Sequence, residues 1–153
     1  MIKIIGISLG LGLVVLFVSA FALGTYYNYR ASHRPEQTRF SQGGLPTKTL
    51  DGFYKGNRPG SAWQGKTFNG SAQSGINNFT DGDKYVFKTL VAKGLKDDKQ
   101  VLKIDYNQPH NPWWLRYVVD ELVQTSDGKY LGKVNLKILP GLPITITYFE
   151  LTK

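Results

Sequence analysis

The sequence begins with an apolar run that carries no charge between residues 4 and 27. At a rise of 1.5 Å per residue, a helix of this length spans about 36 Å, enough to cross a hydrocarbon core of about 30 Å. Tyr26, Tyr27 and Tyr29 end the run and Arg30 follows at once, and both residue types are typical of a membrane interface. We therefore predict a transmembrane anchor over residues 1–29.

A cleaved signal peptide is the alternative, because residues 20–22 (Ala-Phe-Ala) have the small-x-small form of a cleavage site. The length of the apolar run and the tyrosines beyond this site favour the anchor. Lys3 alone precedes the run, whereas Arg30, Arg34 and Arg39 follow it. This excess of basic residues favours the cytoplasmic side of the membrane for the domain that follows.

The segment at residues 30–50 is rich in proline, glycine and small polar residues and has no sustained hydrophobic period. We predict a flexible linker of about 25 Å root-mean-square length, which keeps the following domain near the bilayer. The net charge of the chain is +8, and residues 30–80 hold seven basic and two acidic residues. A basic linker is typical of attraction to anionic headgroups, or of a segment that stops translocation. Nucleic-acid binding is not expected, because the basic residues do not alternate with exposed aromatic residues.

Beyond residue 50, short strand-like runs alternate with turn residues, which predicts a mainly β domain over residues 51–153. The expected strands are residues 62–68, 76–79, 84–95, 101–106, 114–124, 130–138 and 144–151. The loops are too short for parallel crossovers, so neighbouring strands should pair antiparallel. In the run at residues 133–138, apolar residues alternate with Lys133, Asn135 and Lys137, which indicates one apolar and one solvated face.

A sheet of about seven strands with one apolar face has to close or fold over on itself. We therefore predict an antiparallel calycin or lipocalin-like β-barrel or half-barrel, which commonly encloses one small ligand. A two-sheet sandwich is the alternative architecture.

Asp120 and Glu121 are the most notable acidic residues, but in a strand their side chains leave opposite faces. Glu121 shares its face with Leu115 and Tyr117. If that face is interior, Glu121 is a buried carboxylate that either anchors a ligand or forms an internal salt bridge. The predicted ligand-binding residues are Glu121, Tyr117, Trp114 and Arg116, and Trp114 at a barrel mouth could also contact headgroups or simply pack a corner.

Motifs for catalysis are missing from the sequence. There are no cysteines, only two histidines, no phosphate-binding glycine loop, no Gly-x-Ser-x-Gly elbow and no His-Glu-x-x-His motif. We predict no catalytic residue, no metal and no cofactor, and an enzyme that uses Asp120 or Glu121 ranks third among the functions considered.

One stretch of the domain is similar to a known family. The residues Tyr106-Asn107-Gln108-Pro109, Val119-Asp120-Glu121-Leu122 and the run Gly128 to Val134 resemble the DUF4334 family of small bacterial domains. Members often carry an upstream GXWXG domain, which residues 61–66 (Ser-Ala-Trp-Gln-Gly-Lys) resemble, although Ser61 replaces the first glycine. The resemblance covers residues 58–138 and implies a small lipocalin-like β fold. It also implies that Trp63 begins the first strand and plugs one end of the barrel, with Arg116 as a candidate cation over its ring.

These observations favour a membrane-anchored lipocalin-like module that binds a lipophilic small molecule of the lipid or isoprenoid class. The alternative is an accessory subunit of a membrane protein complex. Gly6 and Gly10 have the GxxxG spacing that would let the N-terminal helix pack against another span, although glycine is also simply frequent in membrane helices. The expected partners are the bilayer, a lipophilic ligand and such a complex.

Overall fold

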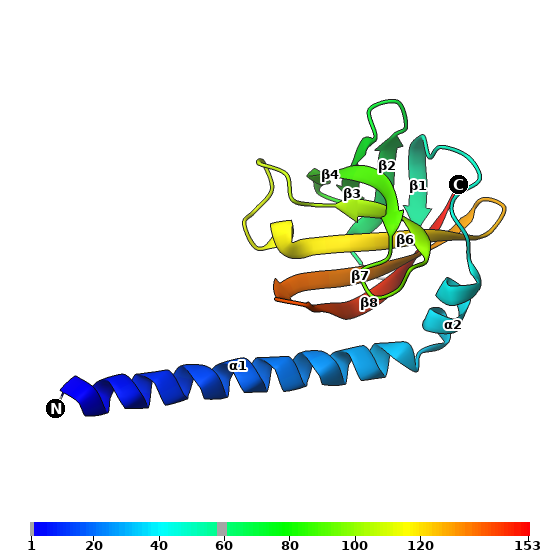
Figure 1. The fold of residues 1–153 in the computed structure, drawn as a ribbon. Helices are drawn as coiled ribbons and strands as arrows, with labels where there is room; N and C mark the ends of the chain where they lie inside the picture. Colours follow the sequence, from blue (N-terminus) through cyan, green and yellow to red (C-terminus); the bar gives the residue numbers. More distant parts are fainter. Residues whose placement is uncertain (1, 58–60) are drawn as a thin grey trace.

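A long helix leads into a closed β-barrel (Figure 1). The computed structural model describes the backbone of residues 2–57 and 61–153, and the side chains of residues 11–57 and 61–153. Within this part of the chain the elements are α1 (Ile2–Ser32), α2 (Pro35–Gln42), β1 (Gly52–Gly56), β2 (Trp63–Asn69), β3 (Ser74–Phe79), β4 (Gly82–Lys93), β5 (Gln100–Asp105), a 3-10 helix η1 (Leu115–Tyr117), β6 (Val118–Ser126), β7 (Lys129–Leu139) and β8 (Leu142–Thr152). The prediction on the GxxxG spacing of Gly6 and Gly10 falls on side chains outside the described residues.

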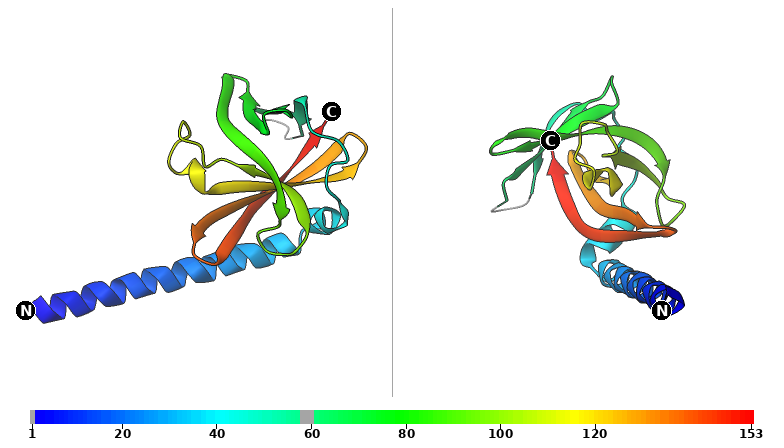
Figure 2. Two further views of the ribbon diagram at one scale, coloured as in Figure 1. Left: turned by 45° about the horizontal axis from the view of Figure 1, so that its top comes forward. Right: turned by 90° about the vertical axis from the view of Figure 1, so that its left-hand side faces the viewer.

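The strands form an up-and-down barrel in which each strand pairs antiparallel with its neighbours in sequence (Figure 2). The barrel closes where β1 meets β8, through the pairs Lys55 with Thr152 and Gly56 with Leu151. The predicted antiparallel barrel is therefore confirmed. β1 was not among the predicted strands, because its five residues include two glycines and offer no alternation to detect.

The interior of the barrel is apolar at the end where β1 and β8 meet. Tyr54 contacts Phe68 and Tyr130 edge to face, with ring centroids 5.3 and 5.4 Å apart, and Leu122 and Leu151 are fully buried beside them. Aromatic pairs of this geometry add to the stability that apolar burial provides. This half of the lumen is a packed core.

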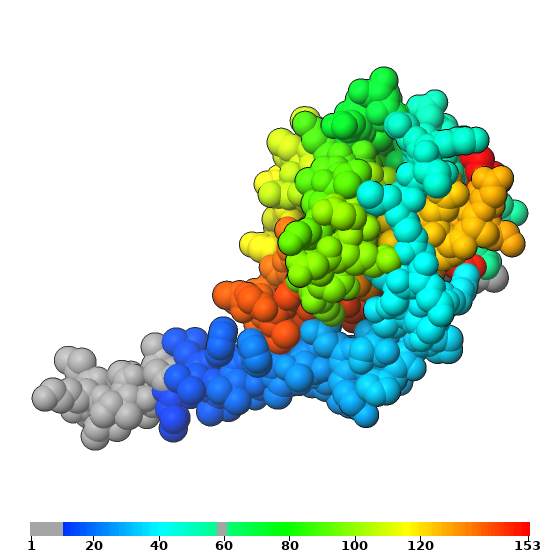
Figure 3. All heavy atoms as spheres, turned by 45° about the vertical axis from the view of Figure 1, so that its right-hand side comes forward, coloured from blue at the N-terminus to red at the C-terminus, as the bar shows by residue number. Residues whose placement is uncertain are grey.

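Both helices cover the outer face of the barrel. Phe40 of α2 is buried against Val101, Val123 and Leu131. Figure 3 shows residues 35–50, in cyan, lying along the barrel surface. The segment predicted to be a flexible linker over residues 30–50 therefore contains the end of α1 and all of α2. Phe40 is the one buried residue of α2, and Leu50 at the end of the segment is buried in the barrel core. A search for periodic hydrophobic patterns does not detect two isolated apolar residues.

The last part of α1 packs on β8. Gly24 lies so close to the strand that a Cβ atom there would come within 2.9 Å of Ile144 Cδ1. Asn28 accepts a hydrogen bond from Thr145 N at 2.8 Å and donates one to Pro143 O at 2.9 Å. The residues before Gly24 extend beyond the barrel (Figure 1), and α1 is long and apolar enough to cross a membrane.

The helices also change the environment of β7. Lys133 and Asn135 were predicted to lie on a solvated face, but both are buried, at 2% and 0% exposure, beneath the helices. The prediction of which β7 residues share a face was correct. The predicted solvated face is wrong for Lys133 and Asn135, whereas Lys137 is exposed as predicted. A sequence period shows which residues share a face and not what covers that face.

Candidate ligand-binding cavity

A cavity of about 340 Å³ opens at the end of the barrel where β6 begins. Its wall is mostly aromatic and apolar, and its floor holds buried polar side chains. The lining residues are Ser61, Trp63, Lys66, Asn77, Phe79, Tyr85, Tyr106, Leu115, Val118, Asp120, Val134, Thr147 and Phe149. An apolar cavity of this size with a few convergent polar groups has the form of a small-molecule site.

A β-bulge in β2 supplies two of these residues. The pairing of β2 with β3 shifts by one position between Trp63 and Gly65, so both Trp63 and Lys66 point into the lumen despite their odd spacing. Gly65 has φ +147°, and a Cβ atom there would lie 2.1 Å from Tyr54 O. Only glycine fits this conformation and this close approach.

The floor of the cavity is a hydrogen-bonded group that we call the inner cluster: Lys66, Asn77, Tyr106 and Asp120. The Lys66 ammonium donates to Asn77 Oδ1 at 2.8 Å, to the Tyr106 hydroxyl, and to Asp120 Oδ2 at 3.1 Å. Tyr106 donates to the same Asp120 oxygen at 3.1 Å. All three ammonium donors of Lys66 are therefore used within the protein.

Four aromatic rings surround the Lys66 ammonium. Its nitrogen lies 4.9 Å from the centroid of Phe149, 5.1 Å from Tyr106, 5.3 Å from Phe87 and 5.7 Å from Trp63. These distances suit cation–π attraction, which offsets part of the cost of burying the charge. The cation over Trp63 is thus Lys66, and the expectation that Arg116 occupies this position is wrong.

Burial also shifts the protonation equilibria of the inner cluster. It lowers the pKa of Lys66 and raises the pKa of Asp120, and in each case the ion pair opposes the shift. The pKa of Tyr106 is raised well above its ordinary value, first by burial and then by the adjacent Asp120 carboxylate. Tyr106 therefore remains a neutral hydrogen-bond donor toward Asp120.

One atom of the inner cluster has capacity left for a ligand. Asp120 Oδ2 receives the bonds from Lys66 and Tyr106, whereas Oδ1 receives no hydrogen bond from the residues that the structure describes. Asp120 lines the cavity, although only 2% of its surface is exposed. The cavity floor therefore offers an acceptor to a ligand that carries an O–H or N–H group.

The predicted ligand-binding residues lie in different places. Trp114 stands at the rim of the cavity, with its ring 6.1 Å from that of Tyr85, which lines the wall. Tyr117 is exposed on η1. Arg116 points away from the lumen and donates to Pro109 O and Asn111 O.

Glu121 lies outside the barrel and is fully buried beneath the helices. Its face includes Val119 and Val123, whereas Val118, Asp120 and Leu122 face the lumen. The hypothesis placed Leu115 and Glu121 on the same interior face of a single strand. This placement of Glu121 was wrong. Leu115 does enter the core, but from η1, and β6 begins only at Val118.

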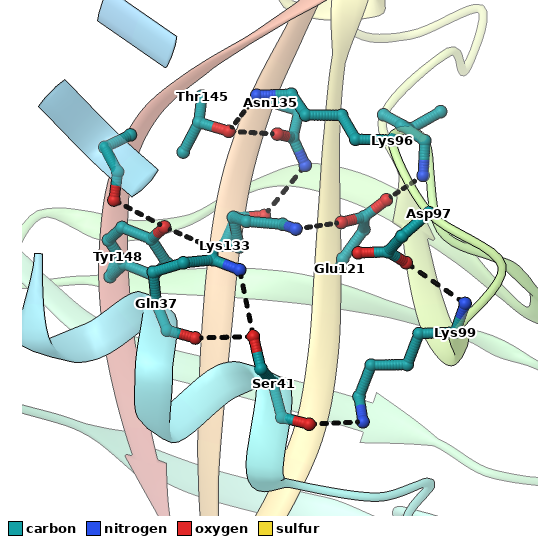
Figure 4. Close-up of polar contacts among 12 residues, drawn as sticks. Gln37, Ser41, Lys96, Asp97, Lys99, Glu121, Lys133, Asn135, Thr145 and Tyr148 are labelled. Carbon is teal, nitrogen blue, oxygen red and sulfur yellow. Dashed lines mark hydrogen bonds and ion pairs between the residues drawn. The ribbon is translucent and has the colours of Figure 1, made fainter. Parts of the chain in front are cut away.

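Glu121 belongs to a second polar group, the outer cluster: Lys96, Glu121, Lys133, Asn135 and Thr145 (Figure 4). Glu121 Oε2 lies 2.9 Å from Lys133 Nζ, and Oε1 accepts a bond from Leu95 N. Thr145 donates to Asn135 Oδ1 at 2.9 Å. This arrangement is the internal salt bridge that was one of the two predicted roles of Glu121.

The barrel has a second cavity, of about 330 Å³, beside residues 45–50 at the opposite end. Its described lining includes exposed side chains such as Val91 and Leu90 but no buried charged side chain. A third, of about 390 Å³, lies between α1 and the outer cluster. The cavity above the inner cluster is the strongest candidate of the three. Among the described residues, it alone of these cavities combines aromatic walls with a buried carboxylate that has an oxygen free to accept a hydrogen bond.

Lys66, Asn77 and Tyr106 were not among the predicted site residues. Lys66 was hidden by the bulge, which breaks the strand period. A lysine between Trp63 and Phe68 in a predicted strand was the available signal, since it has to be either exposed or paired. No group of three or more metal-ligating side chains occurs among the residues described here.

Comparisons with known protein families, with curated proteins and with solved structures find no match to this chain. The resemblance to the DUF4334 family therefore stays a prediction.

Proposed function

We propose that this protein is a membrane-anchored module whose barrel holds a lipophilic small molecule. The observation that carries this proposal is the 340 Å³ cavity with aromatic walls above the inner cluster. A volume of this size accommodates one short chain or a compact ring system, and a longer tail would extend through the mouth.

The position of α1 supports the anchor. Gly24 is the first buried residue of the helix among those whose burial the structure describes, and the helix begins at Ile2. The 22 residues between these points span about 33 Å, close to the thickness of a hydrocarbon core.

The inner cluster suggests the polarity of the ligand. A carboxylate ligand would have to compete with Asp120 for Lys66, whose donors are already used. A hydroxyl group could instead donate to Asp120 Oδ1 without breaking any existing bond. We therefore propose a neutral lipid or isoprenoid with a hydroxyl end, its apolar part lying against Trp63, Phe79 and Phe149.

The first experiment is native mass spectrometry of the full chain released from membranes in mild detergent. A co-purifying small molecule in the lipid mass range is expected. Protein that emerges without a ligand would contradict the proposal. Retention of a stoichiometric protein partner would instead support the accessory-subunit alternative.

The second experiment measures the ligand class with three probes of equal chain length: decanol, decanoic acid and decane. One hydrogen bond to the charged Asp120 carboxylate is worth about 1.5 kcal/mol, so decanol should bind roughly tenfold more tightly than decane. Decanoate should bind more weakly than decanol. Equal binding of all three would refute the proposed role of Asp120.

Two matched variants locate the site. Val134→Phe fills the cavity above the inner cluster, whereas Val91→Phe makes the same change beside the cavity at the opposite end. Decanol binding should fall in the first variant and persist in the second. The reverse result would move the site to the other end of the barrel.

A further inference from the structure

The cavity end of the barrel carries a group of exposed apolar side chains that the ligand site does not use. Trp113 is 75% exposed, Ile138 52%, Trp114 49% and Tyr117 45%. We call these four residues the mouth patch. Several large exposed apolar side chains on one end of a small domain indicate an interaction surface.

The mouth patch faces the direction in which α1 leaves the barrel. In Figures 1 and 2, the loop before η1 and the turn between β7 and β8 form the end of the barrel that points toward the N-terminal half of α1. If α1 crosses a bilayer, this end is therefore the part of the barrel nearest to the lipid surface.

The charges around the patch suit an anionic surface. Arg116 and Lys137 are exposed and share one shallow depression with Trp113 and Tyr117. The acidic residues on the β3–β4 turn are already engaged, Asp81 with Lys84 at 2.5 Å and Asp83 with Asn78 at 2.8 Å. Tryptophan and tyrosine with neighbouring basic residues are the typical composition of a membrane-interface contact.

We propose that the mouth patch lies in the headgroup region of an anionic bilayer and that the cavity opens onto lipid. This inference rests on the proposed membrane-spanning position of α1. Trp114 joins the two features, because its ring contacts Tyr85 on the cavity wall. A lipophilic ligand could then pass between the bilayer and the barrel without crossing water.

The test uses the full chain in vesicles of phosphatidylcholine and phosphatidylglycerol, with or without bromine near the top of the acyl chains. Bromine quenches tryptophan emission only at short range. Trp63→Phe leaves Trp113 and Trp114 as reporters, whereas the paired change Trp113→Phe and Trp114→Phe leaves Trp63. For Trp63→Phe we expect a roughly twofold fall in emission, because interfacial tryptophans lie within reach of the upper acyl chain.

The comparison between these two variants decides the proposal. Greater quenching of Trp63→Phe than of the paired variant supports docking. Equal or smaller quenching overturns it. That result is expected if a protein partner or water covers the patch. If Trp63→Phe does not fold, the wild-type chain against the paired variant gives the same comparison.

A second pair of variants tests the charge. Arg116→Gln together with Lys137→Gln should reduce quenching in anionic vesicles, whereas Lys129→Gln, at the opposite end of β7, should not. Unchanged quenching in the first variant would overturn the anionic part of the proposal. Retention of the chain in membranes after an alkaline wash tests α1 separately, and ligand mass tests the cavity, so a failure of the proposed function is distinguishable from a failure of docking.

Discussion

Two adjacent residues of β6, Asp120 and Glu121, form buried ion pairs on opposite sides of the same barrel wall. Asp120 pairs with Lys66 across the lumen, from β6 to β2, at 3.1 Å. Glu121 pairs with Lys133, its register partner on β7, at 2.9 Å. The inner pair borders the aromatic-walled cavity inside the barrel, whereas the outer pair lies beneath the helices, where Lys133 borders the 390 Å³ cavity beside α1.

This difference supports the proposed division between a structural role for the outer pair and a ligand-binding role for the inner pair. A buried ion pair often stabilises a fold no better than apolar residues of the same size would. The outer pair and its network join β6 and β7 to the loop before β5. The inner pair leaves a carboxylate oxygen beside a cavity, which favours a role in recognition of a ligand over a role in stability.

The largest expected effect comes from Asp120→Leu. This change leaves the Lys66 ammonium buried without its counter-charge and should destabilise the barrel by about 3–5 kcal/mol. Thermal unfolding of the full chain in detergent, followed by circular dichroism, measures the loss. A variant with wild-type stability would show that Lys66 is neutral in the folded barrel, or that water replaces Asp120.

The matched control replaces both partners, Lys66→Met together with Asp120→Leu. Removing the whole pair should restore most of the stability that the single change removes, because no unpaired charge remains. The double variant should also lose the preference for decanol over decane. If it kept this preference, the inner cluster would not be the polar end of the site.

A smaller effect is expected from Glu121→Gln, on the outer side of the wall. It leaves Lys133 without its carboxylate, but Lys133 borders the 390 Å³ cavity beside α1, where water can solvate it. We expect a loss of about 1–3 kcal/mol. Decanol binding should not change. A change in ligand preference in this variant would contradict the division of roles between the two pairs.

The two pairs also show how much of the site the sequence could predict. A salt bridge was among the predicted roles of Glu121 because a buried carboxylate needs a partner, although Lys133 was expected on a solvated face. Glu121 and Lys133 lie on strands that are neighbours in sequence. Lys66 and Asp120 lie on strands that are far apart in sequence and face each other only after the barrel closes. Closure depends on β1, whose short, glycine-containing sequence gave no strand signal.

Other differences between the predicted and the observed structure also have local causes. The predicted strands and the apolar helix follow from hydrophobic period and length, which are properties of single segments. The covering of the outer face by Phe40 and α2 depends on one side chain in a polar segment. The inward position of Lys66 depends on a bulge at Gly65, and neither feature produces a period.

The smallest predicted effect concerns Lys96 of the outer cluster. Burial, and next the charge of Lys133, lower the pKa of Lys96 from 10.5 to about 8. Below pH 8 the lysine is charged in both the folded and the unfolded chain, so the folded state bears the full cost of holding the ammonium there. Between pH 8 and 10.5 the folded chain releases this proton while the unfolded chain keeps it. The stability contributed by Lys96 should therefore rise across this range, because the unfolded state binds more protons.

Lys96→Met removes this titration. The melting temperature of the wild-type chain should therefore rise relative to that of the variant as pH increases. Lys129→Met, on the exposed end of β7, is the control for general alkaline effects. A difference between Lys96→Met and wild type that is constant with pH would show that Lys96 is solvated, and that the outer cluster is less sealed than the comparison with the inner pair requires.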